Sequence, residues 1–534
     1  MLQTMLFLIW VGLILAALWL YYHQVYSRFS KHGIKHFKPL PILGNMARLM
    51  FRIDLFTESI ERNYYAFPGE RFIGKYDFVH PTVMIRDIEL AKKIGIKDFE
   101  HFLDHRIFLN EKTDAFFGRS LISLKGNDWK DMRSTLSPAF TSSKMRFMVP
   151  FMVDVGNQMI ETLNKKIAES GVGYLDVDSK DLATRYANDV IASCAFGLKV
   201  DSHTDQNNEF YLKGKGLTKI TFKQLIKMFG FMFVPKIMEK LKIGLFSKSH
   251  ANYFKNVVQY AMNDREENRV VRPDLIHLLM EAKKGKLSHD KEMATADAGF
   301  STAEESAVGK REVNKVWSDN DLIAQAILFF VAGFETVSSA MAFTLHELTI
   351  NPEVQEKLAE EIRENDRKTG GKFDFDSIQN MAYMDMVVSE ALRLWPPAVG
   401  LDRKCIKDYN LGKPNSESKE DFIIREGEGI EIPVWAFHRD PNYFPDPQKF
   451  DPERFSEENK HNIKPYTYMP FGIGPRNCIG SRFALCEVKV MLYQLLRDME
   501  LVPYEKTCIP SELDRQSVNL MIKGGHWMRL RIRQ

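Results

Sequence analysis

The chain has 534 residues, of which 45% are hydrophobic and 12% aromatic, so it can bury a large core and is not generally disordered. Its formal net charge of +3 is too small to indicate a nucleic-acid-binding protein. The five cysteines form no Cys-x-x-Cys pair, which argues against a zinc site. Their number is small and odd, which fits a reducing compartment.

The N-terminal stretch, residues 1–22, carries no charged side chain and is long enough to span a bilayer. It lacks the basic start and small-residue cleavage site of a signal peptide, and a buried helix is the remaining alternative. The basic residues that follow, Arg28 to Lys38, favour a cytosolic body. We therefore predict an anchor at residues 1–24, a basic, proline-rich linker at 25–44 and a main globular domain at 45–534.

The next segments predict a small sheet and then mostly helices. Residues 69–90 alternate apolar and polar side chains, with a turn expected at His80-Pro81. Residues 99–127 mix aromatic residues with Gly and Asn, which is typical of a long binding loop. Residues 151–270 are predicted to be helical, and the polar residues 283–315 are predicted to form an exposed loop.

Two side chains on the first predicted long helix could bind an anion. Trp129 and Arg133 lie four residues apart, so they share one helix face and can both donate hydrogen bonds to a carboxylate. An ordinary amphipathic helix is the alternative. The neighbouring Lys130, Lys144 and Arg146 form either a docking face for an acidic partner or a solvated surface.

The longest helical pattern covers residues 321–351 and is interrupted in its middle. Gly333 costs about 1 kcal/mol relative to Ala in a helix interior, and Glu335 and Thr336 break an apolar run. The apolar stretch before Glu335 is too short to span a membrane. Either Thr336 bonds back to its own helix and Glu335 pairs with a neighbouring helix, or the two form a chemical site.

Glu390 and Arg393 lie three residues apart, just before Pro396-Pro397, and such a pair alone is a weak signal. The later stretch Phe450 to Phe455 supplies Arg454.

The stretch Phe471 to Gly480 (FGIGPRNCIG) places Cys478 between glycines and directly before an apolar helical run. A helix N-terminus stabilises a thiolate, and glycines let the backbone approach a flat ligand. A cysteine thiolate as the only protein ligand of a haem iron fits this pattern, and Arg476 is placed to meet an anionic group of that ligand. A buried structural cysteine is the alternative.

This stretch resembles the haem-binding signature of the cytochrome P450 family, F-x-x-G-x-R-x-C-x-G, at each fixed position. The W-x-x-x-R, A-G-x-[DE]-T and E-x-x-R patterns and the P-E-R-F stretch also resemble family motifs, in the family order. The resemblance implies a mainly α fold with a small β-sheet, the cytochrome P450 fold, on an N-terminal transmembrane anchor. The motif variants look closest to microsomal, xenobiotic-oxidising members from insects.

The resemblance also implies roles for individual residues. Cys478 would bind the iron, and Thr336 and Glu335 would deliver protons to bound dioxygen. Glu390, Arg393 and Arg454 would form a structural triad. The other expected haem-binding residues are Trp129, Arg133, Arg403, Phe471, Arg476 and Gly480. The expected substrate pocket consists of Phe116, Phe117, Phe330, Val331, Ala332, Ala398, Val399 and Leu401, and residues 518–522 resemble a loop that returns to it.

The implied activity is insertion of one oxygen atom from O2 into a lipophilic small molecule, such as a plant toxin, an insecticide or an endogenous lipid. Electrons would come from NADPH through a separate cytochrome P450 reductase, with cytochrome b5 as a further candidate partner, because the chain has no G-x-G-x-x-G unit of its own. The protein would lie in the endoplasmic reticulum membrane with its catalytic domain in the cytosol. Residues 229–246 are either a core helix or a second membrane-contacting surface. Two alternative functions remain, a haem-thiolate isomerase or dehydratase and a non-catalytic membrane-anchored binder.

Overall fold

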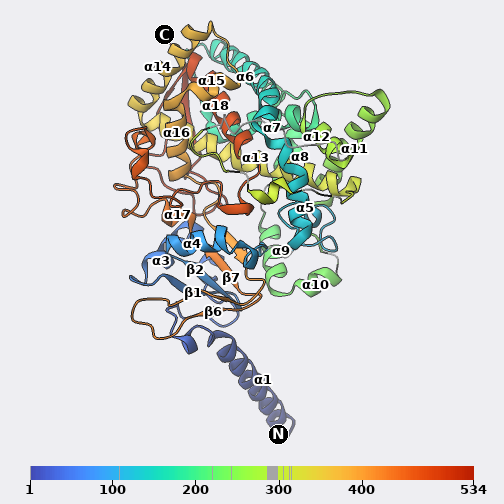
Figure 1. Cartoon of the computed structure of the whole chain (residues 1–534), viewed down its shortest axis with the longest axis vertical. Coiled ribbons are helices and arrows are strands. Elements are labelled where there is room, and N and C mark those ends of the chain that lie inside the picture. Colours follow the sequence, from blue (N-terminus) through green and yellow to red (C-terminus); the bar gives the residue numbers. More distant parts are fainter. Residues whose placement is uncertain are drawn as a thin grey trace. The chain divides into compact units, whose positions relative to one another are not determined.

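The computed structural model describes residues 2–533 except 107–108, 219–220, 242, 285–298, 305, 312 and 314 (Figure 1). The chain divides into two compact units. The smaller unit holds residues 1–106 and 399–436, and the larger unit holds residues 107–398 and 437–534. Helices predominate and the strands form small sheets, as predicted.

The smaller unit is built on a four-stranded sheet in the order β1-β2-β7-β4. β1 (Phe72–Asp77) and β2 (His80–Ile85) form an antiparallel hairpin, β2 runs parallel to β7 (Gly429–Ile432), and β4 (Leu401–Lys404) is antiparallel to β7. The hairpin turn lies at Phe78 and Val79 and not at His80-Pro81 as predicted, because Phe78 takes a left-handed φ of 60° and His80 already pairs with Asp77.

Short elements complete the smaller unit around this sheet. They are η1 (Ser30–His32), α2 (Ala47–Met50), α3 (Phe56–Tyr65), α4 (Ile88–Lys92), η2 (Lys93–Lys97), η3 (Phe99–His101), β5 (Tyr409–Asn410), β6 (Ile423–Ile424) and α17 (Val434–Phe437), whose last residue belongs to the larger unit.

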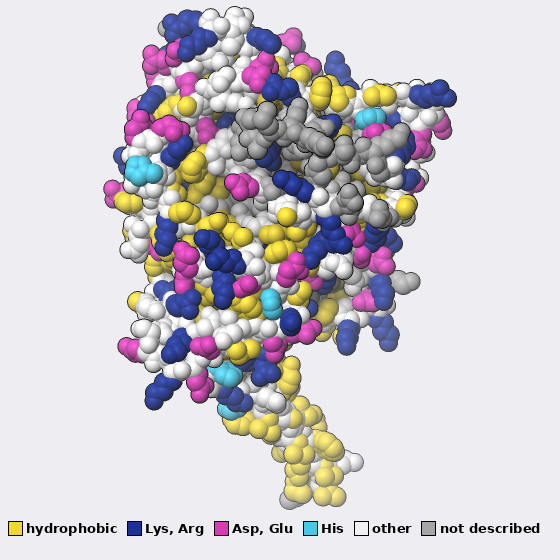
Figure 2. Space-filling view, in the orientation of Figure 1, with side chains coloured by type: hydrophobic (Ala, Val, Ile, Leu, Met, Phe, Trp, Pro, Cys, Tyr) yellow, Lys and Arg dark blue, Asp and Glu magenta, His cyan; other side chains and the backbone are white. Residues whose placement is uncertain are grey.

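Helix α1 (Leu2–Tyr26) has no buried residue, and Figure 2 shows it covered with hydrophobic side chains. Two described helices, α1 and α13 (Asp319–Ile350), are long and apolar enough to cross a membrane. More than half of the apolar part of α13 is buried inside the protein, so its composition reflects a core position. The bare apolar surface of α1 instead fits the predicted membrane anchor.

The larger unit contains the remaining helices and a three-stranded sheet in the order β3-β9-β8. The long helices are α5 (Gly126–Leu136), α6 (Ser142–Ser170), α7 (Ser179–Ile191), α8 (Glu209–Thr218), α9 (Phe222–Phe233), α11 (Lys248–Asn268), α12 (Leu275–Lys283), α13, α14 (Pro352–Thr369), α16 (Ala382–Leu394) and α18 (Ser481–Asp498). The shorter elements are η4 (Phe117–Arg119), η5 (Ser137–Phe140), β3 (Tyr174–Asp178), η6 (Ala192–Phe196), α10 (Pro235–Lys240), η7 (Ala307–Lys310), α15 (Phe375–Asn380), η8 (Pro452–Phe455), η9 (Lys460–Asn462), η10 (Gly474–Arg476), β8 (Met499–Val502) and β9 (Trp527–Ile532).

Helix α13 is the centre of the larger unit and packs against α7, α8, α11, α16 and α18. It begins two residues before the predicted start because Ser318 and Asp321 form a capping box, in which each side chain bonds the other residue's backbone N–H. Its last residue is Ile350, and Asn351-Pro352 terminates it, as predicted.

Two expectations about loops change. The predicted exposed loop at 283–315 is only partly exposed where it is described: Glu304, Lys310 and Arg311 are exposed, whereas Ser301 and Gly309 are buried. Residues 285–298 lie outside the described part. In the interrupted segment 229–246, Phe231 and Met238 are buried, whereas Val234, Ile237 and Leu241 are exposed. A core helix alone does not account for these exposed apolar side chains.

Candidate functional site

The loop that carries Cys478 is folded by glycines and backbone hydrogen bonds. Gly472 and Gly474 take left-handed φ values of 81° and 68°, which other residues resist. The N–H of Cys478 donates to the carbonyl of Phe471 at 2.8 Å, which closes the loop just before α18. Gly480 was expected to need a backbone conformation or a close approach that only glycine allows. The structure shows neither, because its φ is −94° and an added Cβ would meet only Phe140, at 3.9 Å.

Cys478 has an exposed side chain, although it lies deep enough in the fold for burial to dominate the pKa of its thiol. Burial raises the pKa of the Cys478 thiol, and the Gly480 N–H and the Arg133 charge oppose that rise. A buried structural cysteine would have no such accessible surface. The accessible sulfur therefore favours a ligand-facing role.

One stripe of α13 is also accessible in the middle of a buried helix. Ala332 and Thr336, one turn apart, are exposed, whereas Phe334 and Val337 are buried. Gly333 lies on another side of the helix, where an added Cβ would come within 3.0 Å of Ile191 on α7. Gly333 thus permits close packing of two helices, and Ala332 is the small residue on the accessible side.

Thr336 and Glu335 make the contacts that we expect if their role is structural. The hydroxyl of Thr336 donates to the carbonyl of Ala332 at 2.6 Å. Glu335 accepts from Lys180 Nζ of α7 at 3.1 Å and from Asn519 Nδ2 at 3.0 Å. Both side chains stay accessible, since Thr336 is exposed and Glu335 is partly exposed. The two residues can therefore make these contacts and also take part in chemistry.

A short chain of contacts connects the cysteine loop with α13. The nearest side chain to Gly480 is Phe140, and the rings of Phe140 and Phe329 lie 5.0 Å apart. Phe329 is half-buried and lies one turn before Ala332 on α13. The accessible sulfur and the accessible helix stripe are thus linked through two aromatic side chains.

The predicted anion-binding residues of the larger unit gather beside this loop. Trp129 and Arg133 are both buried on α5, and the guanidinium of Arg476 lies 3.9 Å from the centre of the Trp129 ring. Arg476 also donates to the carbonyls of Leu121 and Leu124. Arg133 donates to the backbone carbonyl of Asn477 at 2.7 Å and to its side-chain oxygen at 2.9 Å.

Arg403, in the smaller unit, has an unsatisfied buried group. It is 2% exposed, its Nη1 donates to the carbonyl of Asp402 at 2.7 Å, and its Nη2 has no hydrogen-bond partner in the described part of the chain. Burial lowers the pKa of Arg403. A buried guanidinium nitrogen without a partner is costly, so an anionic ligand group such as a haem propionate would suit it.

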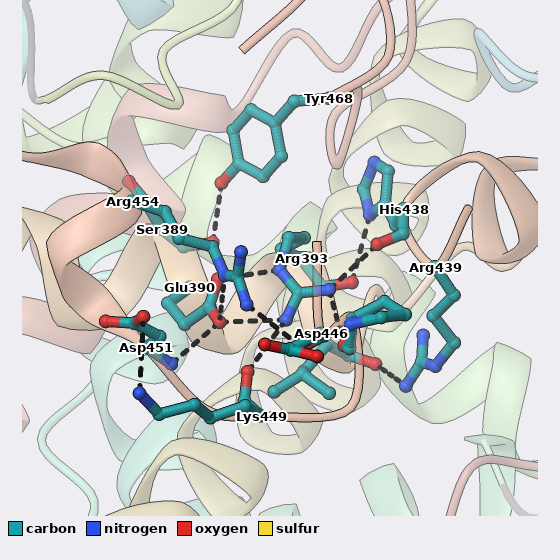
Figure 3. A network of polar contacts seen from close by, with 12 residues as sticks. Ser389, Glu390, Arg393, His438, Arg439, Asp446, Lys449, Asp451, Arg454 and Tyr468 are labelled. Carbon is teal, nitrogen blue, oxygen red and sulfur yellow. Dashed lines mark hydrogen bonds and ion pairs between the residues drawn. The ribbon is translucent and has the colours of Figure 1, made fainter. Parts of the chain in front are cut away.

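The predicted triad is present in the larger unit (Figure 3). Glu390 and Arg393 on α16 are both fully buried and form a bidentate ion pair at 2.7 and 2.8 Å. Arg454 of η8 lies 3.4 Å from Glu390 Oε1, and the N–H of Asp451 donates to the same oxygen at 2.9 Å. Arg393 also donates to the carbonyls of His438, Pro447 and Lys449.

These contacts attach α16 to residues 438–454, the stretch that leads towards the cysteine loop. His438 extends the network, because its Nε2 accepts from the N–H of Met469 at 2.9 Å. Burial and the nearby Arg393 lower the pKa of His438 to about 3, so this histidine is neutral. The arrangement is structural, since Glu390 and Arg393 have no accessible surface.

The expected pocket residues separate into groups. Ala332 and Ala398 are exposed, and Phe116, Val331, Val399 and Leu401 are half-buried. Phe117 stacks on Phe246 with ring centres 3.7 Å apart. Phe330 is fully buried among Phe196, Phe210 and Phe254, on the side of α13 away from Ala332. We therefore leave Phe330 out of the proposed pocket.

Sequence reasoning missed three residues at this site. Asn477 bonds Arg133 next to the cysteine, while Lys180 and Asn519 hold Glu335. Asn519 lies at the tip of a hairpin closed by the pairing of Leu513 with Ile522, within the C-terminal segment predicted to return to the pocket. No sequence pattern near Lys180 indicates its role, because its partner Glu335 is far away in the sequence.

A haem fits this set of side chains. The described residues contain no group of three His, Cys, Asp or Glu side chains placed to hold a metal ion. A porphyrin would supply its own nitrogen donors to the iron, and Cys478 would supply the protein ligand. Trp129, Arg133 and Arg476 would be its nearest polar protein neighbours in the larger unit.

The comparisons with known proteins agree with this geometry. The family model of cytochrome P450 matches residues 35–528. The chain is 43% identical over 513 residues to cytochrome P450 9e2 of Blattella germanica, covering 94% of this chain and 93% of that protein. It is 43% identical over 510 residues to probable cytochrome P450 9f2 of Drosophila melanogaster, covering 94% of each. It is 37% identical over 536 residues to cytochrome P450 9c1 of the same fly, covering 99% of each. The chain belongs to the cytochrome P450 family of haem monooxygenases.

Proposed function

We propose that this monooxygenase oxidises lipophilic small molecules and that Cys478 is the protein ligand of its haem iron. The observation that carries the proposal is the accessible Cys478 sulfur in a densely packed interior, on a loop that has the family signature. The accessible stripe of α13 at Ala332 and Thr336, linked to that loop through Phe329 and Phe140, supports it.

The haem, when bound, would supply the activation of dioxygen. The protein residues would bind and orient the haem and deliver protons to the reaction site. Cys478 would hold the iron, and Trp129, Arg133, Phe471, Arg476 and Gly480 would form its surroundings in the larger unit. Arg403, Val399 and Leu401 belong to the smaller unit, and their expected roles stay predictions.

Thr336 would be the hydroxyl that relays protons in the proposed reaction space. Its O–H donates to the Ala332 carbonyl, and its oxygen can accept a hydrogen bond from a neighbouring group because the side chain is accessible. Glu335 would resupply protons from the adjacent position. The bonds from Lys180 and Asn519 hold that carboxylate in place, so proton delivery would depend on α7 and on the C-terminal hairpin.

The proposed substrates are lipophilic because the accessible side chains that we expect to line the pocket are apolar. In the larger unit they are Phe116, Val331, Ala332 and Ala398, and the buried Phe117 stacks on Phe246. A mainly apolar lining with few polar groups selects apolar molecules. Plant toxins, insecticides and endogenous lipids are the classes to test.

The proposed electron source is NADPH, through a separate reductase, with cytochrome b5 as a second donor. The support is the lack of a G-x-G-x-x-G strand–helix unit in the sequence. The proposed location is the endoplasmic reticulum membrane, with the catalytic units in the cytosol. The exposed apolar α1 and the basic residues Arg28, Lys31, Lys35 and Lys38 after it support this orientation.

The direct test is spectroscopic. Purified protein should show a thiolate-type reduced carbon monoxide spectrum, and Cys478→Ala should lose it; a variant that keeps this spectrum would refute the ligand assignment. With purified reductase and a lipophilic substrate, steady NADPH use with oxygenated product supports a monooxygenase. Product without NADPH use would indicate an isomerase or dehydratase, and protein without haem would indicate a binder.

A further inference from the structure

A segment before α13 lies directly on the cysteine loop. We call residues 299–304 and 306–311 the strap. The side-chain nitrogen of Asn477 donates to the strap carbonyl of Glu304 at 2.6 Å, and the strap N–H of Ala303 donates to Ser481 Oγ at 3.3 Å. Asn477 immediately precedes Cys478, and Ser481 follows it by three residues. The strap therefore bonds the chain on both sides of the cysteine.

Asn477 connects the strap with α5. It is 8% exposed, its two oxygens accept from Arg133, its side-chain nitrogen donates to the strap, and its own N–H donates to the carbonyl of Gly474 at 3.0 Å. Every kind of polar group on this residue thus has a partner. An asparagine that is buried and fully bonded fixes the loop position more firmly than an apolar residue would.

The strap is anchored at both of its ends. At one end Ser301 Oγ lies 2.9 Å from Ser389 Oγ of α16 and 2.6 Å from the hydroxyl of Tyr468. At the other end the carbonyls of Gly309 and Arg311 accept from Ser134 Oγ of α5. The strap thus reaches from α16 to α5 across the outer side of the cysteine loop.

We propose that the strap is a latch that holds the Cys478 loop in position for haem binding, and that Asn477 is the positioning residue through which it acts. The inference rests on the proposed role of Cys478 as the iron ligand. The latch would act by restricting motion of the loop from outside, because strap groups bond residues on both sides of the sulfur. Loss of the latch should make the thiolate–haem linkage break faster. The fraction of the protein that initially binds haem should fall by a smaller factor.

The test measures how fast the thiolate-type reduced carbon monoxide spectrum is lost in mild urea. Asn477→Asp keeps the oxygen acceptors for Arg133 but removes the donor to Glu304, whereas Asn477→Leu removes both side-chain bonds and keeps only the backbone carbonyl that accepts from Arg133. We expect Asn477→Asp to lose the spectrum about tenfold faster than the unmodified protein, the effect of about one buried hydrogen bond, and Asn477→Leu to lose it faster still. Ser481→Ala, which removes the second strap bond, should lose it about threefold faster.

A matched control separates the latch from a general effect of the substitution. Asn459 also donates its side-chain nitrogen to a backbone carbonyl, that of Glu453 at 2.9 Å, but in an exposed position. Asn459→Asp should lose the spectrum at the unmodified rate. If Asn477→Asp matches Asn459→Asp while Asn477→Leu is fast, Arg133 alone positions the loop and the latch is refuted.

A second measurement starts from the unmodified protein, so its main outcome does not depend on the folding of a variant. Hydrogen exchange at the Ala303 N–H should be slow in the haem-bound protein, and Ser481→Ala should speed it. Fast exchange at Ala303 in the unmodified protein would overturn the proposal. If the unmodified protein itself lacks a thiolate-type spectrum, the iron-ligand assignment fails, which is a different result from failure of the latch.

Discussion

The buried triad allows the sharpest prediction on stability. Glu390→Gln keeps the shape of the side chain but removes the negative charge from between Arg393 and Arg454. Breaking one side of a buried ion pair costs about 3–5 kcal/mol, because the remaining charges stay out of water. Arg393 keeps three backbone carbonyl acceptors, so we expect the lower end of this range.

The expected change in melting temperature follows from the size of the larger unit. It has about 390 residues, and an unfolding entropy of about 2.1 cal/mol/K per residue gives about 0.8 kcal/mol/K. A loss of about 3–5 kcal/mol should therefore lower Tm by about 4–6 °C. Differential scanning calorimetry of the haem-loaded protein, with haem absorbance followed in parallel, measures both the shift and the loss of haem.

A surface glutamate supplies the control. Glu356 also has two arginine partners, Arg363 at 2.6 Å and Arg533 at 2.5 Å, but its side chain is 57% exposed. Exposed ion pairs contribute about 0–1 kcal/mol, so Glu356→Gln should shift Tm by about 1 °C or less. Equal shifts for Glu390→Gln and Glu356→Gln would show that burial does not strengthen the triad, and would refute this reasoning.

Three further outcomes are expected. Thr336→Ala should keep the thiolate-type spectrum but lower the product formed per NADPH, and unchanged coupling would remove Thr336 from the mechanism. Lys180→Met should lower product formation about tenfold with an unaltered spectrum, because Glu335 loses its ion pair; normal turnover would show that the pair is only structural. Burial raises the pKa of Glu347 to about 7, above its unfolded value. Its stabilising contribution, up to about 3 kcal/mol, is present below about pH 4.5 and is lost as pH rises through 7, so Glu347→Gln should flatten the fall in Tm over that range.

Local sequence patterns predicted the elements that carry the site. The spacing of Trp129 and Arg133 placed both on α5, and the long apolar pattern gave α13 to within two residues of each end. These features depend on neighbours in the sequence, such as helix periodicity and caps. The helix starts two residues earlier than predicted because Ser318 is the N-cap, so the polar residues Asp319 and Asn320 already belong to its first turn.

Features that depend on distant contacts could not be read in this way. Lys180 and Glu335 are 155 residues apart, and no pattern near either one indicates the pair. The strap was predicted to be an exposed loop because its composition is polar, yet its backbone groups bond Asn477 and Ser481. The burial of Phe330 among other phenylalanines could not be read either, because the sequence alone did not fix which side of α13 is accessible.

The close approach of α7 and α13 has a consequence for tuning the enzyme. The two helices lie alongside each other from the contact of Ile191 with Gly333 to the contact of Ser179 with the carbonyl of Ala342. A methyl group at position 333 would have to displace Ile191 by a few tenths of an ångström. Since α7 also carries Lys180, a movement of α7 that made room for this methyl group would change the position of the ion pair with Glu335, whereas Ala332 and Thr336 lie on another side of α13. On the proposed role of Glu335, the coupling of oxygen use to product could therefore be tuned from the buried side of this helix.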